Sequence, residues 1–250
     1  LLGNKYDVVI NLAAQAGVRY SIENPSKYFD ANLKGFFNIL EASRINNIKH
    51  LIFASTSSVY GNSNNFPLKE DHLTDKPLSF YAASKKCNEV MAYSYSNIYK
   101  LPCTGLRFFT VYGPWGRPDM SLFKFISNIT QSKKIELFNS GNHVRDFTYI
   151  DDIVASIERL IKKPLNNSVP FNIFNIGSDN PQTLRKFIRV IEKNIKIRSK
   201  FILKKLQKGD VKKTHANVDK LNKYINFKPS IDIEKGIFNF VKWFREYYNK

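Results

Sequence analysis

Short apolar runs alternate along the chain with longer segments in which apolar residues recur at helical spacing. Three runs with β-branched and aromatic residues predict buried strands at residues 6–14, 50–54 and 103–109. The intervening segments predict helices at residues 25–46 and 79–99, the first of them opened by Asn24 and Pro25. Strands and helices that alternate with short links predict parallel strands covered by helices on both faces.

Past residue 120 the pattern is less regular. It predicts helices at residues 120–132, 151–162, 184–195 and 233–247, and strands at 135–138 and 171–176. We therefore expect an α/β protein. Residues 1–118 would form part of a doubly wound parallel sheet, and residues 119–250 a smaller α/β lobe with some segments that return to the sheet. Ligands of such sheets bind at the carboxyl ends of the strands.

The net charge is +18 over 250 residues. Residues 185–250 hold 19 Lys and Arg against 6 Asp and Glu, as scattered lysines rather than one block. No zinc-finger spacing, basic zipper or RNA-recognition motif accompanies them, so we expect no nucleic-acid partner. We interpret the charge as a solvated surface, or as a weak attraction for an anionic small substrate.

Other classes of protein are excluded by simple counts. The sequence contains no apolar run of about 18 residues, so it predicts no membrane span. Two cysteines and four scattered histidines predict neither a disulfide framework nor a metal site. We expect a protein of the reduced cytoplasm.

Tyr81 and Lys85 are four residues apart on a predicted helix, which places both side chains on one face. A neighbouring ammonium lowers the pKa of a phenol, so Tyr81 is a candidate proton-transfer group. Thr56 ends the second predicted strand and could hydrogen-bond the same substrate hydroxyl. A hydroxyl, a phenol and an ammonium together are suited to the interconversion of an alcohol and a ketone.

These residues also carry a resemblance. The motifs at 13–19, 55–61, 81–85, 106–114 and 145–152, and Gly209-Asp210-Val211, resemble those of the extended short-chain dehydrogenase/reductase family. Within it, the chain is similar to NAD-dependent UDP-glucuronate 4-epimerases, which serve surface polysaccharide synthesis. The usual Pro before the Gly-Asp-Val motif is replaced here by Lys208. The resemblance implies a Rossmann-like fold, NAD as cofactor and a UDP-sugar as substrate.

The resemblance also implies roles for individual residues. Thr56, Tyr81 and Lys85 would be catalytic. The cofactor would contact Ala13, Ala14, Asn32, Ser55, Tyr81, Lys85 and Phe108. The substrate would contact Ser57, Thr110, Arg117, Arg145, Gln207 and Asp210. Arg117 would hold a uronate carboxylate and Arg145 the diphosphate, because a guanidinium matches both anions.

Three alternatives remain open at this stage. Ser57 and Ser58 stand where relatives that dehydrate or decarboxylate the sugar have carboxyl groups, so we expect plain epimerisation of UDP-glucuronate to UDP-galacturonate. A 4-epimerase of UDP-N-acetylhexosamines or their uronates is the nearest rival. A non-catalytic basic fragment that binds polyanions is the third possibility.

Two further expectations come from the resemblance. The family's glycine-rich strand–turn–helix is not found in this sequence, so we expect that its amino-terminal β–α units are missing. The 250 residues alone would then bind NAD poorly and have little or no activity. The family also forms dimers, and we expect a homodimer through the helices at 25–46 and 79–99.

Overall fold

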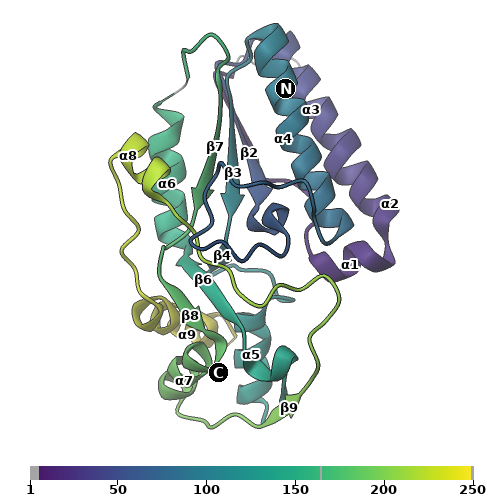
Figure 1. The fold of residues 1–250 in the computed structure, drawn as a ribbon. Helices are drawn as coiled ribbons and strands as arrows, with labels where there is room; N and C mark the ends of the chain where they lie inside the picture. Colours follow the sequence, from purple (N-terminus) through teal and green to yellow (C-terminus); the bar gives the residue numbers. More distant parts are fainter. Residues whose placement is uncertain (1–5, 164, 249–250) are drawn as a thin grey trace. The chain divides into compact units, whose positions relative to one another are not determined.

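The computed structural model describes residues 6–163 and 165–248, and the chain forms two compact units (Figure 1). Unit 1 comprises residues 1–108, 156–176 and 217–227, and unit 2 comprises residues 109–155, 177–216 and 228–250. Unit 1 thus includes two segments from later in the chain, residues 156–176 and 217–227.

Unit 1 contains a four-stranded parallel sheet in the order β1-β2-β3-β7. The strands are β1 (Val8–Asn11), β2 (His50–Thr56), β3 (Cys103–Phe108) and β7 (Phe171–Ile176). Strand β1 is shorter than the predicted run of 6–14. The central strands β2 and β3 are buried almost throughout, as their largely apolar sequences predict.

Helices cover both faces of this sheet, which makes it doubly wound as expected. In Figure 1 the strands lie between α3 and α4 on one side and the second half of α6 with α8 on the other. The helices of unit 1 are α1 (Val18–Glu23), α2 (Pro25–Tyr28), α3 (Gly35–Ile45), α4 (Phe80–Tyr99) and α8 (Asp219–Ile225), and α6 (Ile150–Ile161) enters it at residue 156.

The predicted helix at 25–46 is continuous but not uniform, because a π-helical stretch, η1 (Phe29–Lys34), joins α2 to α3. Its apolar side chains still reach the sheet: Phe36 and Leu40 pack with Leu51 and Phe53 in one core. Gly105 of β3 lies so close to Phe53 that a Cβ there would be 2.7 Å from the Phe53 ring. The sheet core therefore requires glycine at this position.

The outer edge of β7 is closed by side chains. Glu70 Oε1 accepts a hydrogen bond from the backbone N–H of Asn175 at 2.8 Å, and Lys220 Nζ donates to the carbonyl of Ile173 at 2.9 Å. An edge strand otherwise offers such groups to other chains. Residues from two distant segments thus take the place of a further strand.

Unit 2 is a mixed α/β unit with a second core. Its strands are β4 (Thr110–Tyr112), β5 (Ile135–Leu137), β6 (Val144–Tyr149), β8 (Pro181–Thr183) and β9 (Phe201–Leu203). They form the sheet β4-β6-β8 and the pair β5-β9. Its helices α5 (Ser121–Thr130), α7 (Leu184–Ile195) and α9 (Ile233–Tyr248) bury apolar faces, and Phe147 of β6 stacks on Phe187 of α7 at 4.0 Å.

The two short helical turns are η2 (Ser57–Tyr60) and η3 (Phe138–Gly141). Among the described residues, no helix has both the length and the apolar character needed to cross a membrane.

Candidate active site

The three predicted catalytic residues all lie in unit 1. Thr56 ends β2 and is only 6% exposed, and its Oγ1 accepts a hydrogen bond from the backbone N–H of Ser58 at 3.2 Å. Tyr81 and Lys85 occupy the first two turns of α4, which begins where Ser79 caps it by accepting from the N–H of Ala82. Helix α4 packs on β2. Strand β2 thus carries the Thr56 hydroxyl, and the neighbouring helix carries the Tyr81 phenol and the Lys85 ammonium.

Lys85 is a buried cation, with 3% of its surface exposed. Burial lowers its pKa to about 8, and the negative charge of Glu89 opposes that shift. A buried ammonium is suited to a ligand that brings hydroxyl oxygens, such as a ribose.

The segment after β1 is held in place by the buried side chain of Asn32. The Asn32 amide accepts from the N–H of Gln15 at 2.8 Å and donates to the Gln15 carbonyl at 3.0 Å and to Ser84 Oγ at 2.9 Å. Ala13 and Ala14, just before this clamp, are exposed. The Asn32 side chain thus forms hydrogen bonds with other residues of the chain. Its contribution to cofactor binding would come from the conformation that it gives to residues 13–16.

Ser55 and Phe108 lie beside Thr56. The Ser55 hydroxyl donates to Glu89 Oε1 at 2.7 Å, so it points to α4. Phe108 pairs with Thr56 across β2 and β3 and is half-buried at the strand end. Ser57, in the turn that follows Thr56, is also half-buried. The cofactor roles predicted for Ser55 and Phe108, and the substrate role predicted for Ser57, stay predictions.

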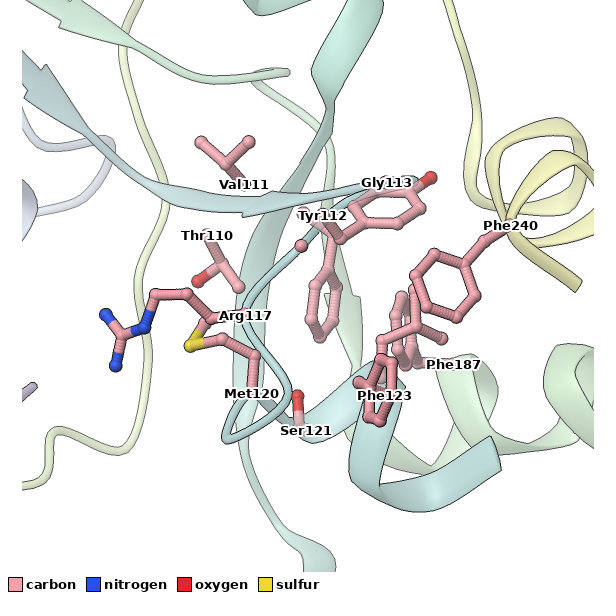
Figure 2. Close-up of a pocket in the computed structure, with 13 residues that line it drawn as sticks. Thr110, Val111, Tyr112, Gly113, Arg117, Met120, Ser121, Phe123, Phe187 and Phe240 are labelled. Carbon is pink, nitrogen blue, oxygen red and sulfur yellow. The ribbon is translucent and has the colours of Figure 1, made fainter. Parts of the chain in front are cut away.

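The other predicted substrate residues belong to unit 2. Thr110 and Arg117 line a cavity of about 40 Å³, whose far wall is formed by Phe123, Phe187 and Phe240 (Figure 2). In Figure 2 the Arg117 side chain points away from these rings. Both sides of its guanidinium fork contact the Asp119 carboxylate, with Nε at 2.9 Å from Oδ1 and Nη2 against Oδ2.

Arg145 belongs to β6, and Gln207 and Asp210 belong to the segment before Lys213, which forms a bridge with Val144 of β6. Arg145 donates to the carbonyls of Val211 at 2.6 Å and Lys212 at 3.1 Å. Burial lowers the pKa of Arg145 to about 10, against the opposing charge of Asp210. The Gln207 amide oxygen is buried and accepts no hydrogen bond within the described chain. Arg145 therefore fixes the segment that presents Asp210.

Comparison with known proteins identifies the family. The chain matches the model of the NAD dependent epimerase/dehydratase family over residues 1–177. Protein CapI of Staphylococcus aureus is 51% identical, over 98% of this chain and 77% of that protein. The chain belongs to the NAD-dependent epimerase/dehydratase family.

Members of this family with named activities are close in sequence and structure. A probable UDP-glucuronate 4-epimerase of Rhizobium meliloti is 44% identical, over 98% of this chain and 76% of that protein. The UDP-glucuronic acid 4-epimerase of Bacillus cereus, solved with UDP-glucuronic acid and NAD, has a TM-score of 0.91 at 30% identity, over 97% of this chain and 76% of that one. The chain thus has the Rossmann-like α/β fold of an epimerase/dehydratase, and NAD is the family's cofactor.

The residues of unit 1 fit such a dinucleotide. The buried Lys85 ammonium would suit ribose hydroxyls, and Ala13 and Ala14 are small residues that follow the carboxyl end of β1, where a dinucleotide would lie. Sequence reasoning missed Glu89 and Arg107, which form a buried ion pair behind Lys85. A signal was present: Glu89 follows Lys85 by one helical turn, and Arg107 is a charge within an otherwise apolar strand.

Proposed function

We propose that the chain catalyses NAD-dependent epimerisation at C4 of a UDP-sugar, with UDP-glucuronate and UDP-galacturonate as the substrate pair. The observation that carries the proposal is the buried Lys85 side chain, one helical turn from Tyr81 on the helix that packs on β2. The names of the relatives support the same reaction.

The chain's own residues would handle the proton. Tyr81 Oη takes the proton of the C4 hydroxyl as a 4-keto sugar forms and returns it when the hydroxyl is restored. Thr56 Oγ1 hydrogen-bonds the same hydroxyl, and Lys85 binds a cofactor ribose and favours the phenolate form of Tyr81. Bound NAD supplies reversible hydride transfer. Rotation of the keto sugar between the two transfers inverts C4.

The residues next to Thr56 favour epimerisation over elimination. Ser57 and Ser58 supply hydroxyls, and the loss of water from a keto sugar needs an acid–base group such as a carboxyl. For the rest of the substrate, Arg145, Gln207 and Asp210 are proposed contacts of the UDP moiety, and Thr110 and Arg117 of the sugar. A role of the product in surface polysaccharide synthesis is part of this proposal.

A second substrate class is favoured by one observation. Arg117 already contacts Asp119 through a two-pronged ion pair, so a uronate carboxylate would have to displace that partner. A UDP-N-acetylhexosamine, which has no carboxylate, would leave the pair intact. A UDP-N-acetylglucosamine 4-epimerase of Methanobrevibacter ruminantium has a TM-score of 0.88 at 31% identity, over 96% of this chain.

Substrate assays separate the two classes. The purified protein is incubated with NAD and either UDP-glucuronate or UDP-N-acetylglucosamine, and the C4 epimers are resolved by chromatography. We expect slow conversion of the uronate at saturating NAD, because weak NAD binding and little activity are expected of these 250 residues alone. Arg117→Ala should lower kcat/KM for UDP-glucuronate by about 10- to 150-fold, because hydrogen bonds to a charged group contribute about 1.5–3 kcal/mol.

The matched control is Arg198→Ala, which removes another exposed arginine that is paired with a glutamate. Conversion of the acetylated sugar alone would transfer the proposal to the second class. Equal effects of the two arginine variants would exclude a carboxylate role for Arg117.

We also propose a cytoplasmic homodimer. The outer faces of α3 and α4 support the dimer, since Phe37, Val90 and Ile98 are 46%, 59% and 62% exposed. Both cysteines are free thiols, which suits a reducing compartment. Val90→Arg should convert a dimer into monomers in sedimentation velocity runs, whereas Leu73→Arg, at an apolar side chain 84% exposed, should not. A monomeric parent protein would refute the dimer.

A further inference from the structure

A buried ion pair connects the catalytic helix to the two central strands of unit 1. Arg107 of β3 donates to Glu89 of α4 through Nε to Oε1 at 2.8 Å and through Nη2 to Oε2 at 2.9 Å. Both side chains are 4% exposed or less. The parallel, two-bond geometry fixes the relative orientation of the two groups as well as their separation.

The same carboxylate also bonds to β2. Ser55 Oγ donates to Glu89 Oε1 at 2.7 Å, and Ser55 pairs with Arg107 in the sheet. The next residues along the two strands are Thr56 and Phe108. Glu89 of α4 therefore bonds to Ser55 of β2 and Arg107 of β3. Each of these residues comes one position before its strand ends, at Thr56 and Phe108, where the proposed chemistry takes place.

On α4, Glu89 belongs to the same face as the catalytic pair. Tyr81, Lys85 and Glu89 are spaced by four residues, so their side chains follow one another along the helix. A displacement of Glu89 would move the other two with it, because a helix transmits such a shift along its axis. The contact made by Glu89 thus bears on where α4 holds Tyr81 and Lys85.

Arg107 extends the connection to the turn after Thr56. Its Nη1 donates to the Tyr60 hydroxyl at 2.9 Å, and Tyr60 in turn donates to Asn175 Oδ1 of β7 at 2.6 Å. Tyr60 ends η2, the turn that begins with Ser57. The Arg107 guanidinium therefore bonds both to α4, which carries Tyr81, and to η2, which begins with Ser57.

We propose that Glu89 and Arg107 are positioning residues, which hold Tyr81 and Lys85 of α4 in register with Thr56 of β2 for proton transfer. The proposal rests on the proposed function. A buried ion pair is a poor way to gain stability, because the loss of hydration offsets most of the attraction between the charges. Its directional bonds do supply a fixed geometry, and a misplacement of about 1 Å can slow a reaction by about 100-fold.

The charge of Glu89 has a second effect on the same site. Arg107 and Ser55 hold the pKa of Glu89 below its usual value, in opposition to its burial, so the carboxylate is ionised at neutral pH. That charge helps Lys85 to keep its proton in a buried environment. The ion pair thus supports the cationic form of Lys85 as well as its position.

The test compares the parent protein with Glu89→Gln and with the double variant Glu89→Met and Arg107→Met. The double variant replaces the pair with apolar side chains of similar size, which proteins tolerate well. Lys86→Met is the control, because Lys86 contacts the same carboxylate at 3.3 Å from a more exposed position. Three quantities are measured: the unfolding midpoint in urea, kcat and KM for the UDP-sugar, and the pKa of Lys85 by NMR of labelled lysine.

A positioning role predicts that the double variant stays folded while kcat falls by about 10- to 100-fold and KM changes by less than about threefold. It also predicts that the pKa of Lys85 falls below 8 in Glu89→Gln and in the double variant, and that Lys86→Met changes neither quantity.

An unchanged kcat with an unchanged Lys85 pKa would overturn the proposal and leave the pair a purely structural one. If the parent protein converts no UDP-sugar even at saturating NAD, the proposed function fails on its own. The Lys85 titration, which needs no substrate, then decides whether the pair controls this site.

Discussion

Asp146 gives a prediction whose magnitude follows from its hydrogen bonds. The carboxylate is fully buried and accepts five of them. Oδ1 accepts from the backbone N–H and the hydroxyl of Ser178 and from the Thr148 hydroxyl. Oδ2 accepts from the backbone N–H groups of Asp179 at 3.1 Å and Ala216 at 3.0 Å. One side chain on β6 thereby joins three segments of unit 2.

Asp146→Asn keeps the shape of the side chain and removes its charge. In the better of its two orientations the amide nitrogen replaces Oδ1, and the two hydroxyls can turn to accept from it. The N–H of Ser178, now 2.7 Å from another donor, loses its acceptor. A buried donor without a partner costs about 1–3 kcal/mol, and the remaining bonds weaken when their acceptor is neutral. We expect a loss of about 2–4 kcal/mol in the free energy of unfolding.

Urea unfolding followed by tryptophan fluorescence measures this loss. The chain has two tryptophans, Trp115 and Trp243, and both belong to unit 2, so the signal reports on the unit that contains Asp146. Asp151→Asn is the control, since this exposed acid in the first turn of α6 should contribute only about 0.3–1 kcal/mol. Equal losses in the two variants would refute the reasoning.

Three further predictions concern unit 1. Gly105→Ala should lower the free energy of unfolding by about 1–3 kcal/mol, because the added methyl overlaps the Phe53 ring; an unchanged urea midpoint would contradict the tight packing. Tyr28→Phe removes the hydroxyl that donates to the carbonyls of Ala16 and Gly17 at 3.0 and 2.6 Å. The free energy of NAD binding, measured by calorimetry, should change more than the free energy of unfolding. Lys85 binds its proton less tightly when folded, with a pKa of about 8 against 10.5, so stability should rise with pH between these values. Lys85→Met should abolish this rise in the free energy of unfolding, and at pH 7 it should be more stable than the parent by up to about 3 kcal/mol. The same dependence of the free energy of unfolding on pH in both proteins would rule this out.

The sequence predicted elements best where one pattern was long enough to be unambiguous. The apolar strands β2, β3 and β7 and the helices α4, α7 and α9 were expected within a residue or two of where they lie. The strands β4, β8 and β9 were not predicted. Each has only three residues, too few to show a clear alternation, and each is defined by the neighbouring strand that pairs with it, although the equally short β5 was predicted at 135–138.

The sequence predicted which residues belong to the candidate site, but not which hydrogen bonds and ion pairs they form. The motifs identified Thr56, Tyr81 and Lys85, because these side chains carry chemistry that a spacing can reveal. The pairing of Arg117 with Asp119, and the use of Arg145 on backbone carbonyls, depend on how a loop folds back on itself. Asn32 shows the same limit: its amide bonds to a segment 17 residues away and to Ser84 on another helix.

The closed edge of β7 has a consequence for how the protein is made. Strand β7 can join β3 as soon as residue 176 has left the ribosome, but Lys220, which bonds to Ile173, is synthesised well after that. During this interval the nascent sheet has a carbonyl at its edge that only water satisfies. Neighbouring nascent chains on the same messenger RNA could pair there. The late arrival of α8 therefore ends a period in which the growing chain is most open to misassembly with its own copies.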